Sequence, residues 1–240
     1  MREGFSGRPA LSARADPPYP VRFLLCLLLS LASAAQADDS VPFCYNYGCG
    51  VEAEVRFDAR QMAQVREQLQ GAADAADERR RLAVVLGSLY GWAGEQLPIR
   101  ADKGGDYADD GVEGRMDCID HATTTTRLLR LLEAHGWLRH HRVIEQARRS
   151  FLILQHFSAV IEQRVAPVAQ GEAEPVGDWC VGCYGEGGSV FAGPQSRNEQ
   201  PAPDPVMDAR WAVDTWFRDN GAPAVVMPLA TWLGGAYPDD

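Results

Sequence analysis

The period of the hydrophobic pattern changes once along this chain of 240 residues. Apolar residues recur at helical spacing in the first half, which predicts helices over 58–70, 75–97 and 117–135. From residue 139 onward they alternate, which predicts strands over 139–146, 151–163 and 211–217. Helices followed by antiparallel strands are typical of an α+β domain. We therefore expect N-terminal helices packed on an antiparallel β-sheet.

Capping and turn residues indicate where these elements begin and end. Asp58 and Asp117 precede the first and third helices, where a carboxylate can accept hydrogen bonds from the first N–H groups. Gly136 follows the third helix in the position that favours a left-handed residue. Near the C-terminus, Asn220-Gly221 predicts a turn and residues 228–232 predict a short helix.

Composition and charge exclude several classes of protein. With 46% hydrophobic and 23% charged residues, the chain can bury a core and is neither disordered nor a coiled coil. It has 33 acidic and 23 basic residues, for a net charge of −10. An acidic chain is unsuited to general binding of nucleic acid or an anionic membrane. We therefore expect no nucleic-acid partner.

The N-terminal segment has the pattern of an export signal. Arg22 precedes an apolar run over 23–31, and Ala35-Gln36-Ala37 has the A-x-A form of a signal-peptidase site. The run is shorter than the ~20 residues that a permanent membrane helix requires. We expect residues 1–37 to be a signal peptide or leader, and the mature protein to be periplasmic or secreted, with no stable membrane anchor.

The cysteines leave one thiol without a near partner. Of six cysteines, Cys26 lies in the leader. Four others form two close pairs, Cys44 with Cys49 and Cys180 with Cys183. The first pair lies in an N-terminal cysteine loop over 38–57, the second in a Gly- and Pro-rich loop excursion over 165–208. An oxidising compartment favours local or crossed disulfides, and a four-thiolate zinc site is the alternative. Cys118 remains as the predicted free thiol.

Cys118 directly follows Asp117, the expected cap of the third helix. The unpaired N–H groups and the positive end of the helix dipole favour a thiolate at this position. Helix N-termini lower the pKa of a cysteine, and the thiolate is the reactive form. We therefore predict that Cys118 is an activated nucleophile.

A nucleophilic cysteine requires a base, and the base requires an orienting group. His156 is the predicted base because it lies within the most strongly alternating strand. We expect His121 to face away from the reacting end of the helix, His135 to close that helix, and His140 and His141 to be solvated on an edge strand.

Asp214 is the predicted orienting group. It lies in the apolar run over 211–217, where an unpaired carboxylate would be costly to bury. A hydrogen bond from the imidazole of His156 would satisfy it. The sequence therefore predicts a triad of Cys118, His156 and Asp214.

The segment around Cys118 resembles that of a known family. Gly114-Arg-Met-Asp-Cys118-Ile-Asp120, after a Gly- and Asp-rich loop, is similar to the G-D-C-x-D segment of the bacterial transglutaminase-like cysteine proteinases. The preceding helix, with Leu86-Gly-Ser-Leu-Tyr-Gly-Trp92, resembles the family's helical lead-in. The resemblance covers about residues 75–165 and 209–221. It implies a papain/transglutaminase-like core in a catalytic domain over 58–240.

The resemblance also implies an activity. It implies a cysteine hydrolase with a protein or peptide substrate, which forms a thioester with a peptide or amide acyl group and passes it to water or to an amine. The Cys118 N–H would be one oxyanion donor. A calcium neighbourhood is implied at Asp117 and Asp120, although helix capping is the simpler role for both and the triad requires no cofactor. The alternative is a catalytically inactive, disulfide-stapled periplasmic binding or scaffold domain of the same fold.

Overall fold

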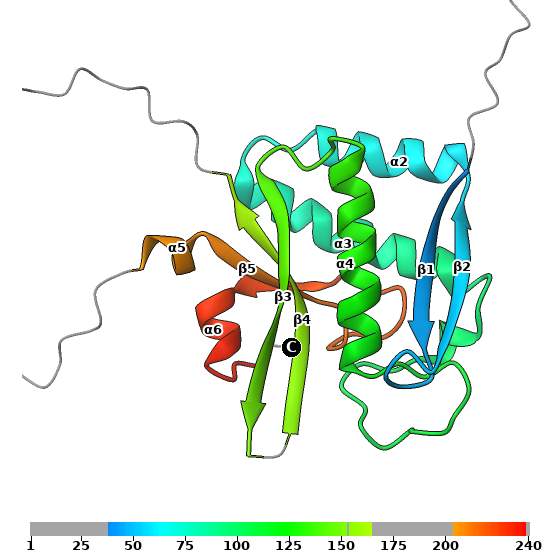
Figure 1. The fold of residues 1–240 in the computed structure, drawn as a ribbon. Helices are drawn as coiled ribbons and strands as arrows, with labels where there is room; N and C mark the ends of the chain where they lie inside the picture. The colour runs from blue at the N-terminus through cyan, green and yellow to red at the C-terminus, as the bar shows by residue number, and fades with distance from the viewer. Residues whose placement is uncertain (1–37, 153, 165–203, 239–240) are drawn as a thin grey trace, which may run out of the picture. The chain divides into compact units, whose positions relative to one another are not determined.

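The computed structural model describes residues 38–152, 154–164 and 204–238 (Figure 1). The predicted leader over 1–37 lies outside these residues, as does most of the excursion over 165–208, including Cys180 and Cys183. The described part contains both helices and antiparallel sheets, so the α+β class predicted from the sequence is confirmed. None of its helices is both long and apolar enough to cross a membrane.

Three helices form where the sequence predicts them. They are α2 (Ala59–Gln70), α3 (Ala75–Ala93) and α4 (Cys118–Ala134). Only α3 is shorter than predicted: it ends ahead of Gly94, and Leu97 is extended (φ −122°, ψ 160°). A residue that precedes a proline is disfavoured in the helical conformation, and Pro98 follows Leu97. The short 3-10 helix η1 (Pro98–Ala101) comes next.

A four-stranded antiparallel sheet has the order β3-β4-β5-β6. Its strands are His141–Phe151, Leu154–Gln163, Arg210–Asp214 and Val225–Pro228. The predicted strand over 211–217 ends at Asp214, because its carboxylate accepts a hydrogen bond from the Trp216 N–H that turns the chain. The sequence does not predict β6, since four residues are too few to show the alternation of apolar and polar side chains that is typical of a strand. Two short helices flank β5 and β6, α5 (Pro205–Asp208) and the predicted α6 (Leu229–Leu233).

The segment over 38–57, predicted as a loop, is a β-hairpin with a short loop at its tip. β1 (Asp39–Tyr45) and β2 (Val51–Phe57) pair in antiparallel register. The hairpin forms because alternate side chains enter the core: Phe43, Val55 and Phe57 are fully buried. The prediction of a loop is therefore wrong for the residues of β1, which form a strand.

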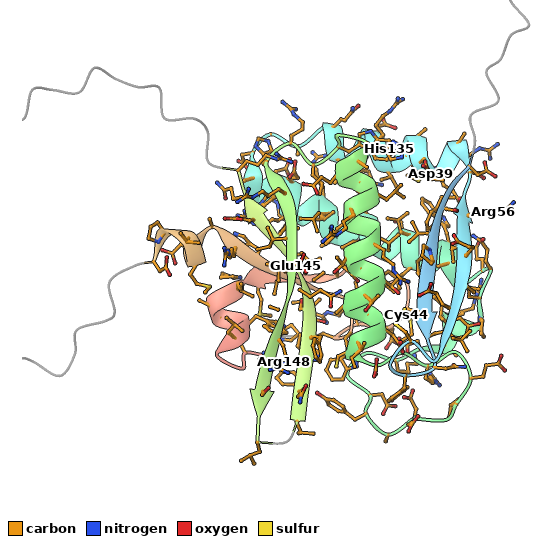
Figure 2. All side chains as sticks on the ribbon, in the orientation of Figure 1. Asp39, Cys44, Arg56, His135, Glu145 and Arg148 are labelled. Carbon is orange, nitrogen blue, oxygen red and sulfur yellow. A yellow bond between two sulfur atoms is a disulfide. The ribbon has the colours of Figure 1, made fainter. Side chains whose placement is uncertain are left out.

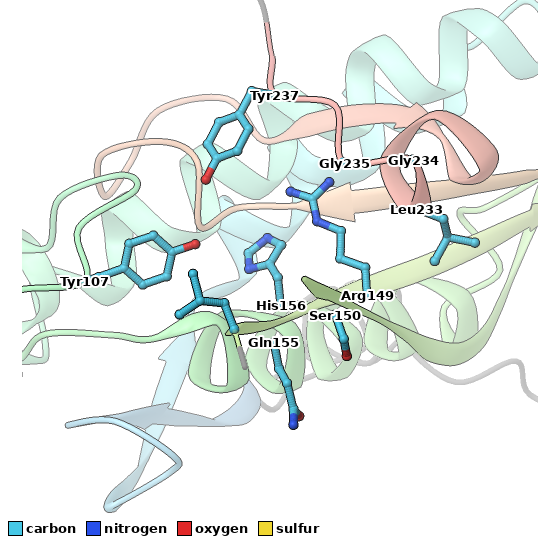
Figure 3. A pocket seen from close by; sticks show the side chains of 10 residues that line it. Tyr107, Arg149, Ser150, Gln155, His156, Leu233, Gly234, Gly235 and Tyr237 are labelled. Atoms are coloured by element: carbon cyan, nitrogen blue, oxygen red, sulfur yellow. The ribbon is translucent and has the colours of Figure 1, made fainter. Parts of the chain in front are cut away.

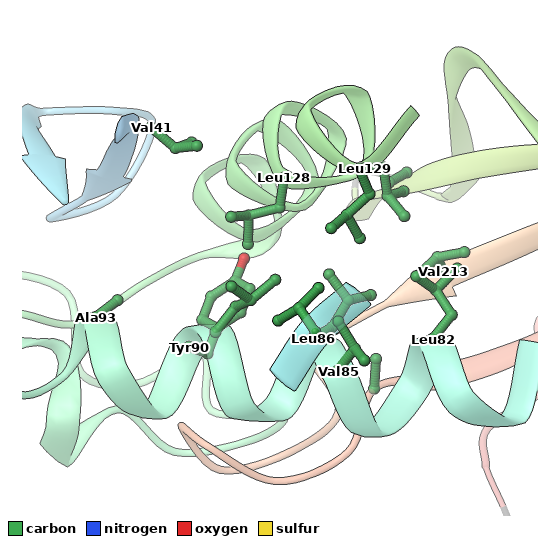
Figure 4. Packing of buried hydrophobic residues seen from close by; sticks show 14 of the residues in the cluster. Val41, Leu82, Val85, Leu86, Tyr90, Ala93, Leu128, Leu129 and Val213 are labelled. Atoms are coloured by element: carbon green, nitrogen blue, oxygen red, sulfur yellow. The ribbon is translucent and has the colours of Figure 1, made fainter. Parts of the chain in front are cut away.

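Helix α4 lies between the hairpin and the four-stranded sheet, in contact with β1 on one side and with β3 and β4 on the other (Figure 1). Beneath it, α3 contributes an unbroken apolar stripe to the core, including Leu82, Val85 and Leu86 (Figure 4). Leu128 and Leu129 of α4 pack against this stripe, and all five side chains are fully buried. The packing fixes the first turn of α4 relative to β4, which is where the candidate site lies.

Candidate active site

Cys118 is the first residue of α4 and is partly buried. Asp117 caps the helix, because its Oδ1 accepts hydrogen bonds from the N–H groups of Ile119 and Asp120, both at 2.9 Å. Among the residues that the structure describes, Cys118 is the one cysteine outside a disulfide. Its Sγ donates to the carbonyl oxygen of Gln155 at 3.8 Å. The thiol at the start of α4 therefore lies against β4.

Asp117 and Asp120, the implied calcium neighbourhood, both bind backbone N–H groups. Besides its capping bonds, Asp117 accepts from Gly48 at 3.1 Å through Oδ2. Asp120 accepts from Cys49 through Oδ1 and from Asp117 at 3.2 Å through Oδ2. All four carboxylate oxygens are thus engaged by the helix start and the hairpin loop, whereas a calcium ion requires ~6–8 oxygen ligands. Burial raises the pKa of Asp120 to about 6, while the Cys49 N–H acts in the opposite direction.

A disulfide joins Cys44 and Cys49 across the tip of the hairpin (Figure 2). One of the predicted local disulfides is therefore present, and the four-thiolate zinc site is wrong, because two of its ligands are bonded to each other. Asp120 lies close to both sulfurs, but disulfide sulfurs do not act as thiolate ligands. The residues from Asn46 to Cys49 all have positive φ, between 57° and 63°, so the disulfide closes a left-handed turn.

His156 lies on β4 with only 5% of its surface exposed. Its Nε2 is 2.7 Å from Oδ2 of Asp214, at the end of the neighbouring strand β5. The hydrogen bond predicted from the apolar setting of Asp214 is therefore present. The other ring nitrogen, Nδ1, is buried and has no hydrogen-bond partner among the described residues. A buried polar atom without a partner is uncommon and is often found where chemistry takes place.

Asp214 is held by two further donors. The indole Nε1 of Trp232 donates to Oδ2 at 2.9 Å, and the backbone N–H of Trp216 donates to Oδ1 at 3.1 Å. The sequence does not predict this role for Trp232, which lies in the predicted short helix α6. A fully buried tryptophan requires an acceptor for its N–H, and this requirement is the only signal in the sequence that could have indicated the contact.

Aromatic rings enclose the imidazole of His156. The ring centroids of Trp216, Phe217 and Trp232 lie 4.7, 5.3 and 5.5 Å from that of His156. Together they exclude water from the hydrogen bond between His156 and Asp214, and the low local dielectric strengthens that bond.

The resting state of Cys118 differs from the predicted one. Burial raises the pKa of the Cys118 thiol, and the carboxylates of Asp117 and Asp214 raise it further, whereas the Phe157 N–H acts to lower it. The sequence predicted a lowered pKa from the helix start alone, and that prediction is wrong because the thiol packs against β4. Cys118 is therefore a neutral thiol near pH 7.

The remaining histidines are mostly structural. His121 is buried, with Nε2 3.0 Å from Asp102 and Nδ1 2.9 Å from the Thr215 hydroxyl. His135 caps the C-terminus of α4, as predicted.

The prediction that His141 is solvated is wrong. Its side chain is fully buried, and Nδ1 lies 2.8 Å from the carboxylate of Glu78. His140 is only partly buried.

A cavity of about 400 Å³ opens beside His156 (Figure 3). It lies between the β3–β4 hairpin and the C-terminal end of α6. Tyr107, Arg149, Leu233 and Tyr237 line it together with His156. Burial raises the pKa of Tyr107, as does a hydrogen bond with Tyr237, so Tyr107 is a neutral phenol. The cavity offers a ligand one cation, two phenols and apolar surface next to the imidazole.

Comparison with known proteins identifies no relative: no family model matches the chain, and no curated protein or solved structure matches it significantly. Any functional conclusion must therefore rest on the residues and their geometry.

Proposed function

We propose that this chain is an exported cysteine hydrolase of the transglutaminase-like type, with a papain/transglutaminase-like core and a protein or peptide substrate. The observation that carries the proposal is the state of His156. One ring nitrogen is bound to buried Asp214, the other is buried without a partner among the described residues, and the Cys118 thiol lies against the same strand. These features match the needs of a nucleophile, a base and an orienting group.

The hydrogen bond to Asp214 decides which nitrogen acts as the base. A carboxylate can only accept, so Nε2 of His156 carries the proton and Nδ1 carries the lone pair. Because the resting thiol is neutral, Nδ1 removes the Sγ proton as the sulfur attacks the substrate carbonyl carbon. The electron pair of the C=O bond moves to oxygen, and the backbone N–H of Cys118 at the helix start donates to it.

The remaining steps return the enzyme to its first state. The C=O bond re-forms, the C–N bond breaks, and the leaving nitrogen takes the proton from Nδ1, which leaves a thioester on Cys118. Water then attacks the thioester carbon and gives a proton to Nδ1. Collapse breaks the C–S bond, the sulfur recovers that proton, and a carboxylic acid leaves. An amine in place of water would give a new amide by the same steps.

The acyl-enzyme can be tested with p-nitrophenyl acetate, which needs no knowledge of the natural substrate. We expect intact-mass spectrometry to detect one acetyl group on Cys118, and nitrophenol release to continue after that site is filled. The control is Cys118→Ser, which changes one atom of a partly buried side chain. It should abolish acetylation and turnover while the melting temperature stays within a few degrees of the parent.

A folded protein whose Cys118 is not acetylated would refute the proposal. That result would favour the non-catalytic binding or scaffold domain. Acetylation without continuing turnover would also contradict the proposal, because the hydrolytic half of the cycle would be missing.

A further inference from the structure

Arg149 is the one permanently charged side chain among the cavity-lining residues that the structure describes. It projects from β3 to the same space as the imidazole of His156 (Figure 3). The chain as a whole carries a net charge of −10. A cation therefore stands beside the candidate base in a protein that is otherwise acidic.

The position of Arg149 is fixed by neutral groups. Its Nη1 donates to the carbonyl oxygens of Trp232 and Ala236, the second at 3.1 Å. Its guanidinium carbon lies 4.7 Å from the ring centroid of Trp232 and 5.8 Å from that of Tyr237. Carbonyl oxygens and aromatic rings hold the side chain in place but leave its full charge without a counter-ion. No carboxylate within the described residues forms an ion pair with it.

The unused edge of the guanidinium fits one kind of ligand. Both hydrogen bonds of Arg149 come from Nη1, so Nε and Nη2 have no partner in the described part of the chain. These two N–H groups are parallel and match the two oxygens of a carboxylate. The hydrogen bond between Tyr107 and Tyr237 uses one of their two O–H groups, and the other can donate to the same anion.

We propose that this cavity is a substrate pocket in which Arg149 binds a carboxylate of the peptide, next to the bond that Cys118 attacks. The inference rests on the proposed function for the identity of the reacting bond, but the carboxylate pocket itself does not. The carboxylate belongs either to an acidic side chain or to the C-terminus of the peptide. The apolar wall formed by Leu233 and the ring of Tyr237 accommodates the methylene groups that carry it.

The first experiment compares two alkylating reagents of the same size on the disulfide-intact chain. Iodoacetate is an anion and iodoacetamide is neutral, and both react with Cys118 thiolate. Both rate constants depend on the nucleophilicity of the same thiolate, so this dependence cancels in their ratio. The ratio therefore measures the electrostatic potential at the sulfur. We expect Arg149→Gln to lower the ratio of iodoacetate to iodoacetamide by about three- to tenfold.

The matched control is Arg148→Gln. Arg148 is the preceding residue of β3, is exposed, and does not line the cavity. Its removal changes the net charge by the same amount but should leave the ratio within about 1.5-fold of the parent, since exposed charges are screened by salt. Arg149→Lys should give a ratio between those of Arg149→Gln and the parent, because lysine keeps the charge but lacks the paired N–H groups.

The second experiment measures binding directly by isothermal titration calorimetry and does not require a reactive thiol. N-acetylglutamate amide carries a side-chain carboxylate, N-acetylglutamine carries a C-terminal one, and N-acetylglutamine amide carries none. We expect one of the two anions to bind at least about tenfold more tightly than the neutral amide, and Arg149→Gln to abolish the difference. Whichever anion binds identifies the source of the carboxylate.

The outcomes separate the two proposals. If neither the ratio of the two alkylation rate constants nor the affinity for the anionic ligand depends on Arg149, the proposal of a carboxylate pocket is refuted. The proposed hydrolase activity is not affected by that result. A Cys118 that reacts with neither reagent, together with Arg149-dependent binding, would refute the hydrolase and support the pocket.

Discussion

Three buried imidazoles in this protein face carboxylates, and their second nitrogens distinguish them. His121 binds Asp102 through one nitrogen and Thr215 through the other. His141 binds Glu78 and lies 3.0 Å from an Arg79 nitrogen. Of these three, only His156 has a nitrogen without a partner among the described residues; Nε2 of His140 is also unpartnered, but His140 is only partly buried. A base must have a free lone pair, so His156 alone of the three can accept a proton from Cys118 without breaking another contact.

Replacing His156 tests this distinction. Gln in its place can still donate to Asp214 but cannot act as a base near neutral pH. We expect His156→Gln to slow nitrophenyl acetate turnover at pH 7 by about 10²–10⁴-fold, the usual contribution of general base catalysis. The residual rate should rise with pH beyond the ordinary thiol range, because the pKa of Cys118 is raised.

The control is His121→Gln, which alters a buried histidine one helical turn from Cys118. It should lower the melting temperature, because the glutamine side chain cannot replace the ring that bridges Asp102 and the Thr215 hydroxyl, but the pH profile of any folded protein should keep the shape of the parent's. Similar pH profiles for His156→Gln and the parent would contradict the assignment of the base.

At the scale of elements, the hairpin loop and the start of α4 form one unit. The loop donates to Asp117 from Gly48 and to Asp120 from Cys49, and the disulfide to Cys44 closes it. A left-handed conformation at non-glycine residues costs free energy, which the surrounding structure must offset. The disulfide therefore supports the helix start from which Cys118 projects.

Removing this disulfide should loosen both ends of the unit. We expect Cys44→Ala/Cys49→Ala to lower the free energy of unfolding by about 2 kcal/mol, the loop-closure contribution for so short a loop. Hydrogen exchange should accelerate at the amides of Gly48 and Cys49 and in the first turn of α4. Reduction of the parent protein should produce the same local change. Unchanged exchange at these amides would show that the loop holds its shape without the disulfide.

The sequence predicted elements better than contacts between elements. Periodicity and caps located α2, α4 and α6 because these signals are local. The buried pair of His141 and Glu78 was missed, since nothing in the alternation of a strand indicates which helix will cover it. The raised pKa of Cys118 was missed for the same reason: the helix start is local, whereas burial against β4 depends on the tertiary fold. The hydrogen bond of His156 to Asp214 could be predicted because a carboxylate in an apolar run needs a partner.

At the scale of the whole molecule, Glu78 connects the helical half to the sheet. This residue of α3 is fully buried and accepts hydrogen bonds from the N–H groups of Arg139 and His140 and from His141. Burial alone raises its pKa, but the hydrogen bonds from His141 and the two N–H groups outweigh burial and leave the pKa below its usual value.

Because this pKa is lower in the folded than in the unfolded protein, the stabilisation is complete above the unfolded value near pH 4.5. It is lost as the pH falls through the folded value. We expect Glu78→Gln to lower the free energy of unfolding by about 3–5 kcal/mol at pH 7, and by less in acid. Urea unfolding at pH 7 and pH 4 measures the difference.

The control for Glu78 is Glu145→Gln, whose side chain is 96% exposed (Figure 2). This variant should change the free energy of unfolding by less than about 0.5 kcal/mol at either pH. A difference between Glu78→Gln and the parent that stayed constant from pH 7 to pH 4 would show that the carboxylate does not act through its charge.

The rings around His156 also give the protein an internal optical probe. The indoles of Trp216 and Trp232 lie within 6 Å of the imidazole, and a protonated imidazole quenches the emission of a neighbouring indole more strongly than a neutral one. His135 stacks on Trp137 at 4.3 Å and is a second imidazole next to an indole, a pair that Trp137→Phe removes. In that background, the emission of Trp216 and Trp232 reports changes at His156 without an added label.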